Sequence, residues 1–328
     1  MKVTLPRVLG LGVAATGLAL SAGAFFESVM ERRDRQRFPA PGQFVDVGGG
    51  RLLHAVLDGT DKPGPLVVLE SGMGCPLEVW TWVRRKVAEF APVLCYERAG
   101  VGRSDPPDEP LSAALATRDL KTLLTALGMP GPYVLAGHSY GGLLIRHFAH
   151  QHPEDVAGLV FLDSSHPDQL DRSHRQRMGL HFVEQDLRTS ITKATFGVMR
   201  LTADAALMRI AGLPEPERSV AMAQYHRRSV SAGTYAELRA WLENVEAAVR
   251  ATTAPPGCPV AVLTATASSD DDPMHMELQR ELAALGRGGV HEIEESGHVE
   301  LIAEEIHAAK VAHVIEKVAR LSELEDET

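Results

Sequence analysis

One stretch, residues 132–142, constrains the fold of this chain more than any other. Its first half is a short apolar run typical of a strand, and its second half opens a helix over residues 143–148. Between them stands Gly-His-Ser-Tyr-Gly, a G-x-S-x-G pattern that places a serine on a tight strand-to-helix turn. A Cβ at Gly137 or Gly141 would crowd this turn. The pattern therefore predicts that Ser139 projects from the sheet edge as a nucleophile.

The chain around this turn alternates between strand and helix patterns, which predicts a doubly wound α/β sheet. A hairpin across residues 48–50 gives the sheet an antiparallel start, and the later strands are expected to be parallel. Besides the strand that leads into Ser139, the predicted strands are residues 44–47, 52–57, 66–69, 93–96, 158–162, 259–264 and 290–293. The predicted helices between them include residues 77–90, 112–127, 274–285 and 304–320.

One block, residues 167–256, breaks this alternation because it shows helical patterns and no strand. Within it, Leu238, Trp241 and Val245 recur at helical spacing, together with Leu242. We interpret the block as a helical lid, and part of its apolar stripe must pack against the core. Residues 41–166 and 257–328 are then the core domain.

The N-terminal segment, residues 1–40, has two interpretations. Lys2 and Arg7 precede 19 uncharged residues, 8–26, and an arginine-rich stretch follows. Small residues at 22–24 fit the cleavage site of a secretory signal, which would leave a secreted protein. The apolar run is longer than a usual signal core, so we favour a retained membrane anchor of one transmembrane helix. A linker is expected at residues 38–42.

Composition excludes some classes of partner. A formal net charge of −10 argues against nucleic acid, whose binding requires a basic face. Three widely spaced cysteines predict neither a disulfide framework nor a zinc site. Histidines at 147, 150 and 152 have spacing that a metal site could use, but a solvated helix end explains them better. We expect no metal and no cofactor.

Several stretches together resemble the α/β-hydrolase family, in particular a bacterial branch with a short N-terminal hydrophobic segment. They are residues 69–74, 96–105, 137–141, 162–169 and 296–298. The resemblance runs from about residue 41 to residue 320 and fails only in the lid. It implies the α/β-hydrolase fold and a Ser-acid-His triad in that chain order. Glu97, where many relatives carry Asp, and Ser71, where His is common, depart from the pattern.

The resemblance also implies roles for other residues. His298 follows the last strand, where the family carries its general base, and imidazole suits proton transfer at neutral pH. Two backbone N–H groups are expected to form the oxyanion hole. One belongs to Tyr140 at the helix N-terminus, and the other to Met73, which follows a strand between two glycines. His138 is expected to point away from the nucleophile and to be structural.

The triad acid has two candidate positions. Asp163 ends the strand after Ser139, a position used by lipase-like members of the family. Asp270, Asp271 or Asp272 would end the next strand, the commoner position. That loop is longer than usual, and three adjacent aspartates also suit a solvated loop. We prefer Asp163, with Asp271 as its main rival.

These assignments predict a serine hydrolase that cleaves a carboxylic ester, or an amide, of a hydrophobic small molecule through an acyl-enzyme on Ser139. An acyltransferase or a haloperoxidase-like enzyme on the same fold is an alternative. A ligand-sensing protein with little turnover is another.

Overall fold

The computed structural model describes residues 5–202, 210–252, 257–269 and 272–326, and within them the strands form one eight-stranded sheet. The strand order is β1-β2-β4-β3-β5-β6-β7-β8. The strands are β1 (Gln43–Asp46), β2 (Leu52–Asp58), β3 (Val67–Glu70), β4 (Val93–Tyr96), β5 (Tyr133–His138), β6 (Val156–Leu162), β7 (Pro259–Ala265) and β8 (Arg287–Glu294). This order brings the carboxyl ends of β3, β5, β6 and β7 side by side.

The direction of the strands follows the predicted pattern. β2 pairs antiparallel with β1 and with β4, while the other pairs are parallel. The β1–β2 turn uses three glycines with positive φ, from 69° to 111°, at residues 48–50. Glycine adopts this backbone region at little cost, which explains the tight hairpin. The predicted eight-stranded, mostly parallel α/β sheet is therefore confirmed.

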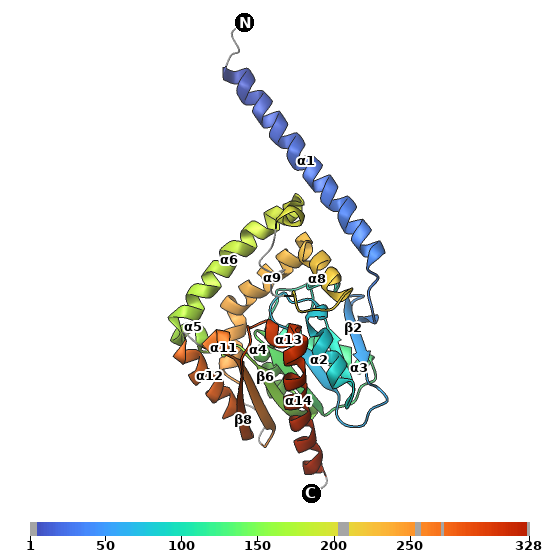
Figure 1. Ribbon diagram of the computed structural model, residues 1–328, viewed down its shortest axis with the longest axis vertical. Coiled ribbons are helices and arrows are strands. Elements are labelled where there is room, and N and C mark those ends of the chain that lie inside the picture. The colour runs from blue at the N-terminus through green and yellow to red at the C-terminus, as the bar shows by residue number, and fades with distance from the viewer. Residues whose placement is uncertain (1–4, 203–209, 253–256, 270–271, 327–328) are drawn as a thin grey trace.

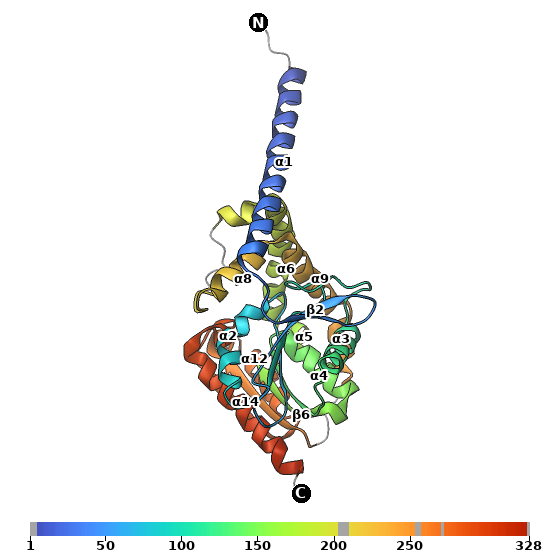
Figure 2. The same cartoon turned by 90° about the vertical axis from the view of Figure 1, so that its right-hand side faces the viewer.

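Helices cover both faces of the sheet, because alternate strand residues are buried on opposite sides. On one side, Val67 and Leu69 join a core with residues of α2 (Thr81–Val87) and α14 (Glu305–Asp326). On the other, Val68 joins a core with residues of α3 (Ala113–Ala126), α4 (Gly141–Gln151) and α12 (Pro273–Ala283). Figure 2 shows α2 and α14 on one side of the strands and α3 and α4 on the other.

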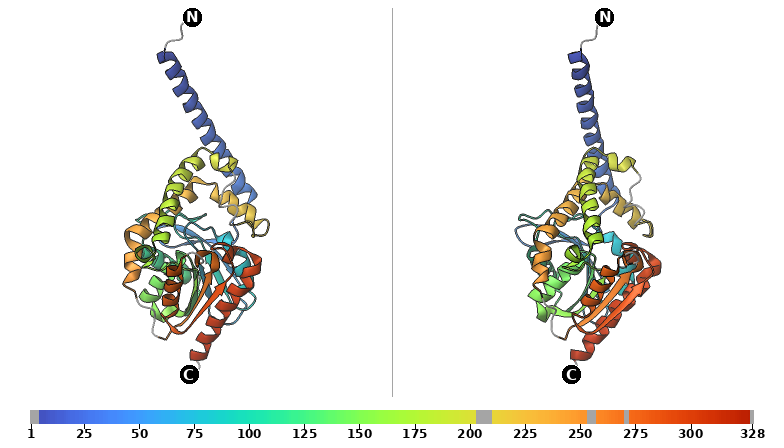
Figure 3. Two further views of the ribbon diagram at one scale, coloured as in Figure 1. Left: turned by 60° about the vertical axis from the view of Figure 1, so that its left-hand side comes forward. Right: turned by 90° about the vertical axis from the view of Figure 1, so that its left-hand side faces the viewer.

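Every element described between Gln169 and Arg250 is helical. The elements are α5 (Gln169–Arg172), α6 (His174–Thr195), η3 (Val198–Leu201), α8 (Glu217–Tyr225), α9 (Arg228–Ala240), the π-helical turn η4 (Trp241–Val245) and α10 (Glu246–Arg250). Figures 1 and 3 show α6, α8 and α9 together over one end of the sheet. Leu238, Trp241 and Val245 are buried, whereas Leu242 is 44% exposed. Trp241 and Val245 pack with Leu143 and Leu144 of α4, so part of the apolar stripe joins lid to core.

The N-terminal segment forms one continuous helix, α1 (Leu5–Arg37), whose last half lies against the lid (Figure 1). Arg200 of η3 pairs there with Glu27 at 2.6 Å and with Asp34 at 2.7 Å. The predicted transmembrane anchor is not supported. Across the described residues no helix combines the length and the apolar character needed to cross a bilayer.

Candidate active site

Ser139 lies between β5 and α4 in a backbone conformation that few non-glycine residues adopt. Its φ is +53°, in the left-handed region. A Cβ at Gly141 would lie 2.4 Å from the Glu70 carbonyl oxygen, and one at Gly137 would lie 2.8 Å from the Gly141 backbone. Both glycines are therefore required where the chain turns from strand into helix. The Ser139 N–H donates to the Leu162 carbonyl at 3.2 Å, which ties the turn to β6.

Asp163 and His298 meet at the same edge of the sheet. Asp163 directly follows β6 and is also held at a positive φ, +43°. His298 follows β8, in the loop before α13 (Glu300–Ala303). The His298 Nδ1 lies 2.5 Å from Asp163 Oδ2, and the Asp163 side chain is fully buried whereas that of His298 is 41% exposed. His298 thus turns one ring nitrogen to a buried carboxylate and leaves the other available.

Three further donors surround the Asp163 carboxylate. Oδ1 accepts from His275 Nε2 at 2.9 Å and from the Ala265 N–H at 3.2 Å, and Oδ2 also accepts from Ser268 Oγ at 2.5 Å. Burial by itself raises the pKa of Asp163, but the hydrogen bonds from His275 and His298 outweigh burial and hold that pKa well below its usual range. The carboxylate therefore stays ionised at neutral pH.

His275 was not identified from the sequence. It lies in the first turn of α12, 112 residues from its partner Asp163. No local motif marks it. The packing of α12 against β7, which pairs with β6, brings the two side chains together.

The other predicted acids have different places. Asp270 and Asp271 lie outside the described residues. Asp272 is buried and caps the N-terminus of α12, and its Oδ2 accepts from Ser173 Oγ at 2.7 Å. Ser173 in turn caps α6, so Asp272 joins two helix starts. In the described part of the chain, Asp163 is the carboxylate that contacts His298.

The loop after β3 carries Met73 past the nucleophile. A Cβ at Gly72 would lie 3.3 Å from Ser139 Cβ and 2.9 Å from His138 Nδ1, so the backbone approaches Ser139 closely. Within the described residues, the amide N–H groups of Met73 and Tyr140 have no acceptor. Tyr140 is the N-cap residue of α4, where the helix dipole favours negative charge. Two free donors therefore lie beside Ser139.

His138 packs against the loop that carries His298. Its ring packs on that of His298, with centroids 4.6 Å apart, and its Nε2 lies 2.8 Å from the His298 carbonyl oxygen. Burial lowers the pKa of His138 to about 3, with neighbouring His298 adding to the effect. A neutral imidazole that donates to the His298 backbone supports the loop that carries this histidine. A structural role for His138 therefore stays a prediction.

These residues line one cavity of ≈ 680 Å³, a size typical of small-molecule sites. Ser139, Asp163, His298 and Met73 form its floor. The lid forms the opposite wall, mainly through α6. The apolar side chains of that wall are Leu180, Phe182, Val183, Leu187, Met199, Val230 and Trp241.

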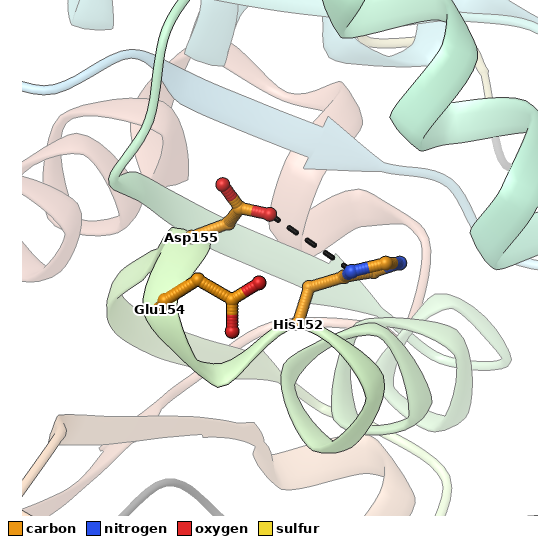
Figure 4. Close-up of side chains that lie close together, drawn as sticks. All are labelled: His152, Glu154 and Asp155. Atoms are coloured by element: carbon orange, nitrogen blue, oxygen red, sulfur yellow. Dashed lines mark ion pairs between the residues drawn. The ribbon is translucent and has the colours of Figure 1, made fainter.

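Two groups of histidine and carboxylate side chains lie outside this cavity. His152, Glu154 and Asp155 gather after α4, without His147 or His150 (Figure 4). Asp155 already pairs with Lys121 at 2.5 Å, which satisfies its charge. In the second group, around His166, the carboxylates pair with Arg172 and Arg250. Neither group therefore supports a metal proposal.

Comparison with known proteins identifies the family. The model of the alpha/beta hydrolase family matches residues 66–314, which include Ser139, Asp163 and His298. The chain belongs to this family. The match spans every strand of the sheet after β2 and the whole lid.

A curated relative, the "Probable transporter efuK" of Hormonema carpetanum, is 37% identical over 126 residues, which is 37% of this chain and 18% of the relative. The aligned segments span 18%, 54% and 40% of the first three curated relatives, so the chain matches only part of each.

Solved structures share the fold. An epoxide hydrolase variant of Bacillus megaterium with its diol product has a TM-score of 0.64 at 15% identity, covering 85% of this chain and 100% of that one. An esterase of Exiguobacterium antarcticum has a TM-score of 0.60 at 17% identity, covering 84% and 99%.

Proposed function

We propose that this protein is a serine hydrolase that cleaves a carboxylic ester of a hydrophobic small molecule. The observation that carries the proposal is the hydrogen bond from His298 Nδ1 to the buried Asp163 carboxylate, in the cavity that Ser139 also lines. Ser139 is the nucleophile, His298 the general base and Asp163 the acid. The N–H groups of Met73 and Tyr140 form the oxyanion hole.

In the proposed reaction, Ser139 Oγ attacks the ester carbonyl while His298 Nε2 takes its proton. The tetrahedral oxyanion accepts hydrogen bonds from the Met73 and Tyr140 amides. Collapse of this intermediate breaks the ester C–O bond, and the leaving alcohol receives the proton from His298. Water, deprotonated by His298, then attacks the acyl-enzyme and releases the carboxylic acid and free Ser139.

The chemistry of serine favours an ester over an epoxide as the substrate, although two structural neighbours are described as epoxide hydrolases. Attack of a hydroxyl on an epoxide would form an ether on Ser139. An ether has no carbonyl that water could attack, so turnover would stop after one cycle. Attack on an ester forms an acyl group that water can remove, and a neighbour of the same fold is an esterase.

The lid wall supports a hydrophobic substrate. Phe182 is 62% exposed and Val183 is 37% exposed, and both line the cavity from α6. Burying the area of these side chains that is still exposed against an apolar acyl or alcohol group contributes roughly 25 cal/mol per Å². Activity should therefore rise with the chain length of the ester until the cavity is filled.

The test uses p-nitrophenyl esters and a fluorophosphonate probe. Wild-type protein should release a burst of p-nitrophenol and become labelled, whereas Ser139→Ala should do neither while it remains folded. Ser190→Ala is the matched control, because Ser190 lines the same cavity from α6 and has no role in the mechanism. Labelling that persists in Ser139→Ala would contradict the assignment of the nucleophile.

A further inference from the structure

Lid helix α9 lies directly on two loops of the core. A Cβ at Gly74, which has a φ of +64°, would lie 2.1 Å from Thr234 Oγ1. A Cβ at Gly233 would lie 2.0 Å from the Gly100 carbonyl oxygen. Glycine at 74 and at 233 therefore lets α9 approach both the loop after β3 and the loop after β4. Glu237 is one turn further along the same helix face.

The Glu237 carboxylate joins these two loops. Its Oε2 accepts from the Gly74 N–H at 2.7 Å, and its Oε1 accepts from Arg98 Nε at 2.6 Å. Arg98 then donates to the Ser71 carbonyl at 2.7 Å and to the Gly72 carbonyl at 3.0 Å. The backbone groups on both sides of Met73 are thus held by one buried Glu–Arg pair.

The same pair also contacts the second oxyanion residue. The Arg98 guanidinium lies 5.4 Å from the centroid of the Tyr140 ring, and the Trp241 ring packs on that ring at 5.6 Å. Burial disfavours the charged form of Arg98, but the carboxylates of Glu237 and Glu70 outweigh burial and raise its pKa well above the ordinary value. Arg98 is therefore a permanent cation between two buried carboxylates.

We propose that Glu237 is a positioning residue through which lid helix α9 orients the Met73 amide for oxyanion stabilisation. The proposal rests on the proposed serine hydrolase function. Glu237 does not touch the substrate; it acts through Arg98 and Gly74. The lid is thereby part of the catalytic geometry as well as the wall of the cavity.

Glu237→Gln tests this role with almost no change of shape. Two donors, the Gly74 N–H and Arg98 Nε, face the carboxylate, and a carboxylate accepts from both. A glutamine offers one oxygen and one NH₂ group, so one donor must face another donor, and the loop must shift. Because loss of one oxyanion donor lowers kcat by about 10²–10³, we expect kcat to fall by roughly 10- to 10³-fold. KM should change by less than about threefold, because ground-state binding is untouched.

A trifluoromethyl ketone measures oxyanion stabilisation directly, since its adduct with Ser139 carries a negative oxygen. Its affinity should fall by the same factor as kcat/KM in Glu237→Gln. Glu243→Gln is the matched control. Glu243 lies six residues after Glu237, is about half exposed, and pairs with Arg239 rather than with a core loop. This variant should match wild type in kcat and in inhibitor affinity.

Hydrogen–deuterium exchange of residues 70–75 tests the coupling without any reliance on turnover. Exchange there should be faster in Glu237→Gln than in wild type or Glu243→Gln. Unchanged exchange, or an unchanged kcat in an active wild type, would overturn the inference and leave the proposed function intact. If wild type shows no Ser139-dependent turnover, the proposed function fails, and exchange at residues 70–75 alone decides whether Glu237 holds this loop.

Discussion

Replacing Asp163 by asparagine should abolish turnover by forcing His298 into the wrong tautomer. The Asp163 carboxylate accepts from Ala265 and His275 at Oδ1, and from Ser268 and His298 at Oδ2. An ionised carboxylate only accepts, so each of these four groups is a donor. An asparagine at 163 supplies one oxygen that accepts and one NH₂ group that donates. The hydrogen bonds made at either the Oδ1 or the Oδ2 position must therefore change.

The hydrogen-bond partners of residue 163 determine which of the two carboxylate oxygens is replaced by the NH₂ group. The Ala265 amide is an obligatory donor and needs the remaining oxygen. The Ser268 hydroxyl can rotate to accept, and His298 can move its proton from Nδ1 to Nε2. The new NH₂ group should therefore face His298. With its proton on Nε2, His298 cannot take the proton of Ser139.

Asp163→Asn should cause a large loss of kcat and a small loss of folding stability. Loss of the correct tautomer lowers kcat by about 10⁴ in a serine triad, equivalent to ~5.4 kcal/mol of barrier. The fold should lose only about 1–3 kcal/mol, because the partners of residue 163 remain hydrogen-bonded after the switch. The assay is kcat on a p-nitrophenyl ester beside the thermal midpoint, with ¹⁵N NMR of His298 to report the tautomer.

Asp272→Asn is the matched control, since Asp272 is the described member of the rival acid group. Asparagine caps a helix N-terminus about as well as aspartate, so the variant should lose less than about 1 kcal/mol of stability and keep kcat within roughly threefold of wild type. The reasoning is refuted if folded Asp163→Asn stays within about tenfold of wild type in kcat. Loss of turnover on substitution of Asp270 or Asp271 would place the acid in the other loop.

Two further predictions concern pH and the N-terminal helix. Burial lowers the pKa of His138 to about 3, so between that pH and about pH 6.5 the folded state binds fewer protons than the unfolded state. The contribution of His138 to the free energy of unfolding should therefore be fully present above about pH 6.5 and fall as the pH drops towards 3. His138→Gln should remove up to ~1.4 kcal/mol per pH unit of this slope in urea unfolding between pH 6.5 and pH 4, and parallel curves would exclude His138 as the cause. Arg200→Leu leaves Glu27 and Asp34 without their partner, so α1 should detach from the lid and trypsin should cut residues 32–37 faster than in wild type. Arg218→Leu is the control, because this exposed lid arginine pairs with Glu215 and lies outside the cut segment; equal cutting rates in the two variants would contradict the docking.

The sequence predicted the features that depend on local pattern. Apolar runs such as residues 93–96 became strands because a parallel sheet buries both faces of a strand. The turn at Ser139 could be predicted from the sequence because it requires two glycines within five residues. Local pattern could not choose between the candidate acids, because Asp163 and the aspartates after β7 all follow strands at one sheet edge. Only the pairing of β6 with β7 and of β7 with β8 brings His298 beside Asp163.

Long-range contacts explain what the sequence could not predict. Glu237 lies 163 residues from Gly74, and His275 lies 112 residues from Asp163. Neither residue belongs to a motif, and a glutamate in a polar helix is usually a solvated side chain. The prediction of a membrane anchor relied on the length of the uncharged run at residues 8–26, and no helix among the described residues has the length and apolar character that a spanning helix requires.

The lid supports the candidate site from two directions. On one side, Ser173 at the start of α6 bonds Asp272, which caps the helix that brings His275 to the Asp163 carboxylate. On the other side, Glu237 of α9 bonds Gly74 beside Met73. A core without residues 167–256 would therefore lose more than a cavity wall, because Arg98 would keep its buried charge with one carboxylate fewer. The inserted helices therefore contact both the cap of the helix that carries His275 and the loop that carries Met73.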